Sequence, residues 1–109
     1  MDPPGVRTAA VLATSGGGTW DAGTGSAVTR ARGRAILVYG AVSDAVAAAK
    51  RAARAGAATG LAVGELSNRD GWWAGPTLDV ADALAQRAGA GHVLASATVP
   101  LLAPPSADR

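Results

Sequence analysis

Three arginines that alternate along the chain are the residues best suited to bind an anion. Arg30, Arg32 and Arg34 straddle a predicted hairpin turn, and a planar guanidinium group can pair with a phosphate or a carboxylate through two parallel hydrogen bonds. Together with Arg69 they could form a surface for a nucleotide phosphate or an acidic partner. We favour a simpler interpretation, a solvated hairpin whose charges protect a sheet edge from pairing with another chain.

A run of glycines is the second candidate for ligand binding. The backbone N–H groups of Gly16, Gly17 and Gly18 could point at a phosphate. The run lacks the Lys-Ser or Lys-Thr pair of a P-loop, and no strong helix signal follows it. We therefore favour a flexible linker over a phosphate site here.

Two adjacent tryptophans stand out in a chain with few aromatic residues. Trp72 and Trp73 lie in a polar segment. If they are exposed, they would anchor an interface or stack on a ligand. If they fold over the sheet, they would be the largest side chains of the core. The sequence leaves both roles open, and each tryptophan could take a different one.

Composition excludes most other catalytic chemistry. The chain has no cysteine, so it has no disulfide, thiolate metal site or thiol nucleophile. His92 is the only histidine, which excludes a histidine metal cluster and a Ser-His-Asp triad, and we expect it to be a partly exposed structural residue. Ser15, Glu65 and Ser96 have no partner pattern that would make them catalytic. We predict no metal site and no cofactor.

Small residues dominate the composition, so the core must be thin. The 109 residues include 28 alanines and 15 glycines, and the hydrophobic content of 49% is therefore largely methyl groups. Buried apolar surface stabilises by about 25 cal/mol per Å², so this composition predicts close backbone packing and a need for a partner, with oligomerisation expected. The net charge of +2 is too small to argue by itself for nucleic-acid binding.

No segment has the character of a membrane anchor. No apolar run approaches the ~18 to 20 residues of a membrane-spanning helix, and residues 1–7 lack the basic and apolar regions of a signal peptide. We expect a cytoplasmic bacterial protein with no membrane contact. Residues 6–103 should form one domain between flexible, proline-rich termini at 1–5 and 104–109.

A short alternation of strands and helices must position these residues. Gly33 suits the turn of a hairpin. Ser43 is the expected N-cap of a helix that Gly56 stops, Pro76 suits the first turn of a second helix that ends before Gly89, and a loop is expected at residues 67–74. The predicted strands cover residues 8–14, 25–31, 35–39, 60–66 and 92–96. This order predicts an α+β open sandwich with one sheet covered by helices.

The second half of the chain resembles the class III adenylyl/guanylyl cyclase homology domain. The motifs that carry the likeness are Gly64-Glu-Leu66, Gly75-Pro-Thr-Leu-Asp-Val-Ala81 and Ala90-Gly-His-Val-Leu-Ala-Ser-Ala-Thr98. The match runs without a gap from Gly64 to Leu102. Upstream, residues 27–39 are similar to the hairpin of the family, and residues 8–19 are similar to its metal-binding strand and turn. Residues 20–24 stand where the family has a long helical segment.

The resemblance implies a shortened ferredoxin-like palm. Its sheet would be rich in antiparallel pairs and would carry both helices on one face. In the family, two such palms face each other head to tail, with composite active sites at the dimer interface. A homodimer is therefore the expected assembly.

The positions that match the catalytic residues of the family carry other residue types. The two metal-binding aspartates match Thr14 and Gly33, and the purine-reading pair matches Thr29 and Trp72. The asparagine and arginine that stabilise the transition state match Asp79 and Ala83. Without the two carboxylates the site cannot hold the Mg²⁺ pair. The resemblance therefore implies an inactive cyclase homologue, alone or in a heterodimer.

The sequence thus predicts a noncatalytic domain that acts through protein contacts. We expect a homodimer, or a complex with another protein, that serves as a regulatory scaffold in signalling. The alternative is a sensor of a nucleotide or another anion, with a vestigial pocket lined by Gly16 to Gly18 and the hairpin arginines. A weaker alternative is nucleic-acid binding through Arg30, Arg32, Arg34 and Arg51, which requires affinity that falls steeply with salt.

Overall fold

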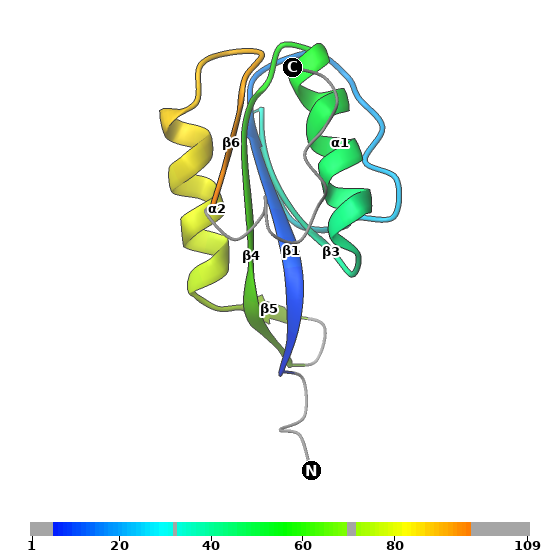
Figure 1. Cartoon of the computed structure of the whole chain (residues 1–109), viewed down its shortest axis with the longest axis vertical. Helices are drawn as coiled ribbons and strands as arrows, with labels where there is room; N and C mark the ends of the chain where they lie inside the picture. The colour runs from blue at the N-terminus through cyan, green and yellow to red at the C-terminus, as the bar shows by residue number, and fades with distance from the viewer. Residues whose placement is uncertain (1–5, 32, 70–71, 97–109) are drawn as a thin grey trace.

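One twisted sheet, with a helix on each side, forms the body of the molecule (Figure 1). The computed structural model describes residues 6–31, 33–69 and 72–96. In chain order, the elements within these ranges are β1 (Val6–Ser15), β2 (Ser26–Ala31), β3 (Arg34–Tyr39), α1 (Val42–Arg54), β4 (Ala58–Arg69), β5 (Trp72–Ala74), α2 (Pro76–Arg87) and β6 (Val93–Ala95). The predicted termini, 1–5 and 104–109, lie outside the described residues.

The sheet is antiparallel except at one edge. Its strands follow the order β2-β3-β1-β4-β5, and β6 pairs in parallel with the first part of β4. At the centre, Leu12 of β1 lies opposite Leu37 of β3 and Leu61 of β4. The predicted fold class, an α+β open sandwich with an antiparallel-rich sheet, is confirmed.

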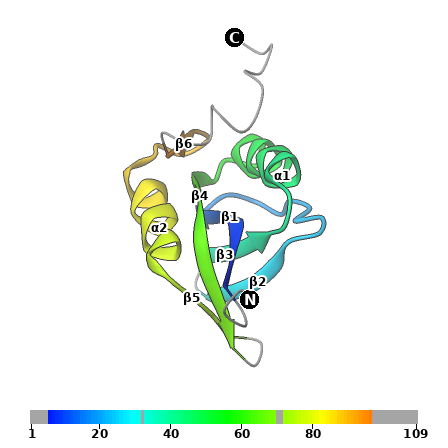
Figure 2. The same ribbon diagram turned by 60° about the horizontal axis from the view of Figure 1, so that its bottom comes forward.

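The helices cover opposite faces of the sheet, so the expectation that both lie on one face was wrong (Figure 2). Successive side chains of a strand point to opposite faces. On β1, Ala10 and Leu12 pack with the alanines of α1, whereas Ala9, Val11 and Ala13 pack with those of α2. We call these the α1 face and the α2 face. The middle of β1, residues 9–13, is continuously apolar, because both faces of the strand are buried there.

Close packing of small residues, which the composition predicted, holds α2 on the sheet. A Cβ atom on Gly60 would lie 2.1 Å from the Ala81 carbonyl oxygen and 2.4 Å from the Ala85 nitrogen. Gly64 is similarly tight, since its Cβ would lie 2.4 Å from the Thr77 hydroxyl. The glycines of β4 therefore let the helix backbone approach the strand directly. On the other face, α1 buries the alanines Ala45, Ala48, Ala49 and Ala52.

Helix α1 starts two residues earlier than predicted. Its N-cap is Ala41, with extended backbone angles and no side-chain cap, so Ser43 lies inside the first turn rather than at the cap. Val42 packs against the α1-face core, and this burial outweighs the small gain of a serine cap. The predicted stop at Gly56 is confirmed, since its φ of 91° is a left-handed angle that favours glycine.

The predicted loop at 67–74 is instead a hairpin. Strand β4 continues to Arg69, and β5 returns beside it with Trp73 opposite Asn68. Tryptophan favours strands, and Trp73 gains burial by packing on the α2-face core. Tertiary packing therefore overrides the polar, loop-like composition of this segment.

The connection between β1 and β2 crosses the α1 face. Trp20 and Ala22 pack against the α1-face core. The Tyr39 hydroxyl donates to the Ala22 carbonyl at 2.7 Å, and Arg51 Nε donates to the Asp21 carbonyl, also at 2.7 Å. The hydrogen bonds hold this segment beside α1. The α2 face is consequently left with a single helix.

No helix in the part of the chain that the structure describes is long and apolar enough to cross a membrane.

Candidate functional site

The end of the sheet where β1 finishes brings several predicted site residues together. The Gly16 N–H donates to the Gly33 carbonyl at 2.8 Å, and Ser15 lies opposite Arg34 in the register. Thr14 immediately precedes this contact. The glycine run and the β2–β3 turn are therefore neighbours, as the resemblance implied.

Thr14 points away from the face on which the other site residues lie. It is 4% exposed and shares the α1 face with Ala10 and Leu12, because residues two apart on a strand lie on the same face. Ser15 and its partner Arg34 lie on the α2 face. Of the two β1 residues, Ser15 is thus the one that faces Arg34. Alternation along a strand places Thr14 and Ser15 on opposite faces, but the register shows which of them faces Arg34.

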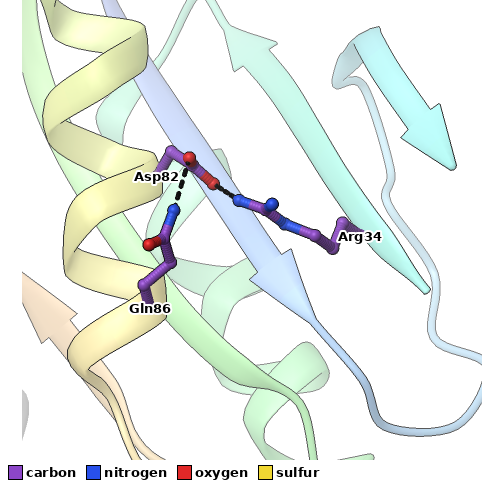
Figure 3. A network of polar contacts seen from close by, with 3 residues as sticks. All are labelled: Arg34, Asp82 and Gln86. Carbon is purple, nitrogen blue, oxygen red and sulfur yellow. Dashed lines mark hydrogen bonds and ion pairs between the residues drawn. The ribbon is translucent and has the colours of Figure 1, made fainter. Parts of the chain in front are cut away.

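An ion pair spans the α2 face at this end (Figure 3). Arg34 extends from the start of β3 across β1 and donates to the Asp82 carboxylate on α2. Gln86, one turn later, donates from Nε2 to the second Asp82 oxygen at 2.8 Å. Asp82 therefore has a partner at each oxygen. Sequence reasoning did not single out Asp82 or Gln86, since 48 residues separate Arg34 from Asp82 and no local pattern joins them.

The two matched transition-state positions flank this ion pair on α2. Asp79 is exposed in the first turn, and Ala83 is exposed next to Asp82. Neither carries a group that could donate hydrogen bonds to a phosphoryl oxygen. At these positions α2 thus presents Asp82, which Arg34 binds, the exposed carboxylate of Asp79 and the methyl group of Ala83.

The two positions that match the purine-reading pair lie far apart within one chain. Thr29 belongs to β2 and Trp72 to β5. These are the two ends of the strand order β2-β3-β1-β4-β5. A single copy of the chain does not bring them together.

The glycine run already uses backbone donors within the protein. Besides the Gly16 contact, the Gly18 N–H donates to the Ala55 carbonyl at 2.8 Å. Gly17 lies directly on Ala57, so that an added Cβ would lie 2.6 Å from its nitrogen. Two of the three N–H groups that a phosphate would need are thus engaged. The expected flexible linker is instead fastened to the β2–β3 turn and to the end of α1.

The four arginines do not form one surface. Arg34 lies beside Ser15, at the end of the sheet where β4 begins. Arg69 is at the other end of β4, 12 residues long, and roughly 35 Å away at about 3.3 Å per residue. The backbone of Arg30 lies opposite Ala35, close to the turn. Arg32 falls outside the described residues.

The remaining singled-out residues have structural contacts. Trp73 packs on the α2-face core. The Glu65 carbonyl, not its carboxylate, accepts from the Thr77 hydroxyl at 3.1 Å. His92 is exposed, and its backbone carbonyl accepts from the Thr59 N–H. The Ser96 N–H donates to the Leu61 carbonyl at 2.8 Å.

The residues at this end do not fit a pair of divalent metal ions. Mg²⁺ needs carboxylate oxygens, but Thr14 and Gly33 offer none and Asp82 is bound to Arg34. Within residues 6–31, 33–69 and 72–96, no group of three or more histidine, cysteine, aspartate or glutamate side chains could hold a metal ion. No catalytic step through a metal can therefore be built from these residues.

Comparison with known proteins identifies a structural relative. No protein-family model and no curated protein matches this sequence. Among solved structures, the chain is similar to an adenylate/guanylate cyclase/hydrolase from Silicibacter pomeroyi, with a TM-score of 0.73 and 16% sequence identity over 88% of this chain and 79% of that chain. At this identity the likeness concerns the fold alone, and the fold of this chain is cyclase-like.

Proposed function

We propose that this chain is a noncatalytic cyclase-like domain that acts through protein contacts, as a homodimer with a regulatory role in signalling. The observation that carries the proposal is the incomplete cover of the α2 face. Helix α2 packs on β4 and β1. The part of the same face formed by β2 and β3 lies beyond it.

Large apolar side chains line the uncovered part of this face. Val28, Ile36, Trp73 and Leu78 pack against the α2-face core and remain only partly buried. Val28 and Ile36, on β2 and β3, belong to the uncovered part of the face, and Leu78 comes from α2, whereas Trp73 lies on β5 at the other edge of the sheet. Covering such side chains stabilises by about 25 cal/mol per Å² of apolar surface. A chain with so thin a core gains much from burying them against a second copy.

The side chains at the matched catalytic positions support a noncatalytic role. A cyclase reaction requires metal ions to activate the ribose hydroxyl and to neutralise the triphosphate. Asp82 is the carboxylate that α2 brings to this end of the sheet, and it is already paired with the cationic side chain of Arg34. Loss of metal binding removes the mechanism rather than slowing it.

Sedimentation velocity from 1 to 200 µM protein tests the homodimer. We expect a sedimentation coefficient that rises with concentration, and a shift to monomer in Ile36→Ser and Leu78→Ser. Val80→Ser is the matched control, because Val80 is an exposed apolar residue of α2, 45% accessible, that is not part of the α2-face core. A compact monomer at every concentration would exclude the dimer.

Incubation with ATP or GTP and Mn²⁺ tests the lack of catalysis. We expect no cyclic nucleotide above the level of a heat-denatured sample. A product that forms with the native chain and disappears in Asp79→Ala or Asp82→Asn would show that the domain is a cyclase.

A small-ligand sensor, the second hypothesis, has less support. Its pocket would need the N–H groups of Gly16 and Gly18, and both already donate to backbone carbonyls. Its other ligands would be the hairpin arginines Arg30, Arg32 and Arg34, of which Arg34 binds Asp82. A thermal-shift panel of nucleotides at millimolar concentration, with and without Mg²⁺, distinguishes the hypotheses, since a bound ligand raises the melting temperature.

A further inference from the structure

Backbone hydrogen bonds tie four turns into one end of the molecule. The end of α1 is the centre of this contact, because the Ala55 carbonyl accepts from Gly18 at 2.8 Å and the Ala57 carbonyl accepts from Gly91 at 3.0 Å. Gly16 adds the β2–β3 turn through Gly33. We call this surface the turn end: residues 15–18, 33–34, 55–57 and 89–91. Figure 1 shows it at the top, where both helices finish.

Most of the basic residues of the described chain gather at the turn end. Arg51 and Arg54 lie in the last turn of α1, and Arg87 lies in the last turn of α2. Lys50 precedes Arg51 on α1, and Arg34 starts β3. Arg54 and Arg87 are exposed.

Carboxylates gather toward the other end. Asp44 and Asp79 lie in the first turns of the two helices, where both helices begin. Glu65 lies opposite Thr8, near the start of β1. Because Arg7 and Arg69 also lie toward this end, it is close to neutral, and the overall charge of +2 averages it with a basic end. The overall charge by itself therefore does not describe the charge of the turn end.

The basic charge exceeds what the local structure neutralises. The C-terminus of each helix carries about half a negative charge, and the Arg34–Asp82 pair is neutral. Asp21, whose backbone carbonyl accepts from Arg51, adds one carboxylate nearby. Arg51, Arg54 and Arg87 together outweigh these charges. A positive surface remains at the turn end.

We propose that the turn end binds the phosphodiester backbone of a nucleic acid, a role that goes beyond the proposed dimer scaffold. Arginine matches phosphate through paired hydrogen bonds. The turns consist of serine, glycine and alanine apart from Arg34, so a phosphate backbone can approach closely. A membrane surface is less suitable, because these turns lack the large apolar side chains that a surface-bound protein inserts into lipid.

Fluorescence anisotropy with a labelled 20-base-pair DNA duplex tests the proposal. Neutralising about three phosphates gives a slope of about −2.7 in log K against log salt. Affinity should thus fall about 40-fold between 50 and 200 mM KCl. The double variant Arg54→Gln, Arg87→Gln should bind more weakly, with a slope shallower by about 1.8.

A matched control separates the turn end from overall charge. The double variant Arg7→Gln, Arg69→Gln loses the same charge near the opposite end, where Arg7 lies opposite Leu66, and should bind the duplex like the native chain. Equal loss in both variants, a flat salt response, or no binding at 50 mM KCl up to 100 µM protein would overturn the proposal. So would sedimentation with phosphatidylserine vesicles in the absence of duplex binding. The salt series is measured on the native chain alone, so it tests the proposal even if a variant fails to fold.

Discussion

Gly60 of β4 lies directly beneath Ala81 of α2, so close that a Cβ atom on the glycine would be 2.1 Å from the alanine carbonyl oxygen. No real Cβ atom tolerates such a distance from backbone. Because the obstructing atoms belong to a helix backbone, a rotamer change cannot relieve the clash. The close approach of α2 to the sheet therefore depends on this glycine.

Replacing Gly60 with alanine should destabilise the fold by displacing α2. Overpacking of this kind costs about 1–3 kcal/mol, and each kcal/mol lowers the melting temperature by roughly 4–8 °C in a domain of about this size. Thermal denaturation followed by circular dichroism measures the change. Gly40→Ala is the matched control, since a Cβ there would meet nothing within 4 Å. Equal melting temperatures for the two variants would contradict the packing described.

The order and type of the main elements could be predicted because local signals and burial agree. Gly33, Gly56 and Pro76 stand where the backbone needs them, and the apolar stretches become the central strands. The β4–β5 hairpin and the placement of the helices could not be predicted. Both depend on which face of the sheet buries a given side chain, and β1 is apolar on both faces.

Substitutions at the start of α1 test whether Ala41 or Ser43 is the N-cap. Ala41 has the extended backbone of an N-cap, with φ −120° and ψ 132°, but no side chain that can accept a hydrogen bond from the first turn. Ala41→Ser should therefore stabilise the protein by about 0.5–1 kcal/mol. Ser43→Ala should change stability by less than about 0.5 kcal/mol. Urea denaturation measures both, and a loss of about 1 kcal/mol in Ser43→Ala would restore Ser43 as the cap.

The hydroxyl of the buried Tyr39 holds the β1–β2 connection in place. Tyr39 is fully buried, and its hydroxyl donates to the Ala22 carbonyl. Tyr39→Phe should cost about 1 kcal/mol, because the Ala22 carbonyl loses its shorter hydrogen bond and keeps only the one from the Gly25 N–H at 3.4 Å. Thr24→Ala removes an exposed bond of the same segment, from Thr24 Oγ1 to Asp44 at 3.3 Å, and should cost less than about 0.5 kcal/mol. Similar losses in urea denaturation would argue against the anchoring role of Tyr39.

The site could be predicted only in part. The resemblance located the end of the sheet that joins the glycine run to Gly33, and the structure confirms that these turns are in contact. The resemblance did not indicate the ion pair between Arg34 and Asp82. These residues are 48 positions apart in the chain, and their contact depends on where α2 packs on the sheet. The face of Thr14 was likewise undetermined until the register of β1 was known.

The Arg34–Asp82 pair should contribute little to stability, even though it spans the α2 face. The side chains are 47% and 28% exposed, and exposed ion pairs are typically worth about 0.2–1 kcal/mol. A double-mutant cycle with Arg34→Gln and Asp82→Asn isolates this coupling from the other contacts of each residue. We expect a value within that range at low salt.

Salt distinguishes an exposed ion pair from a buried one. In 1 M KCl the screening length falls to about 3 Å, so the coupling between Arg34 and Asp82 should shrink toward zero. Arg54→Gln with Asp79→Asn gives the control cycle. These residues lie on helices that cover opposite faces, and their effects should add at either salt concentration. At protein concentrations low enough for a monomer, a coupling above about 2 kcal/mol that persists in 1 M KCl would contradict an exposed pair.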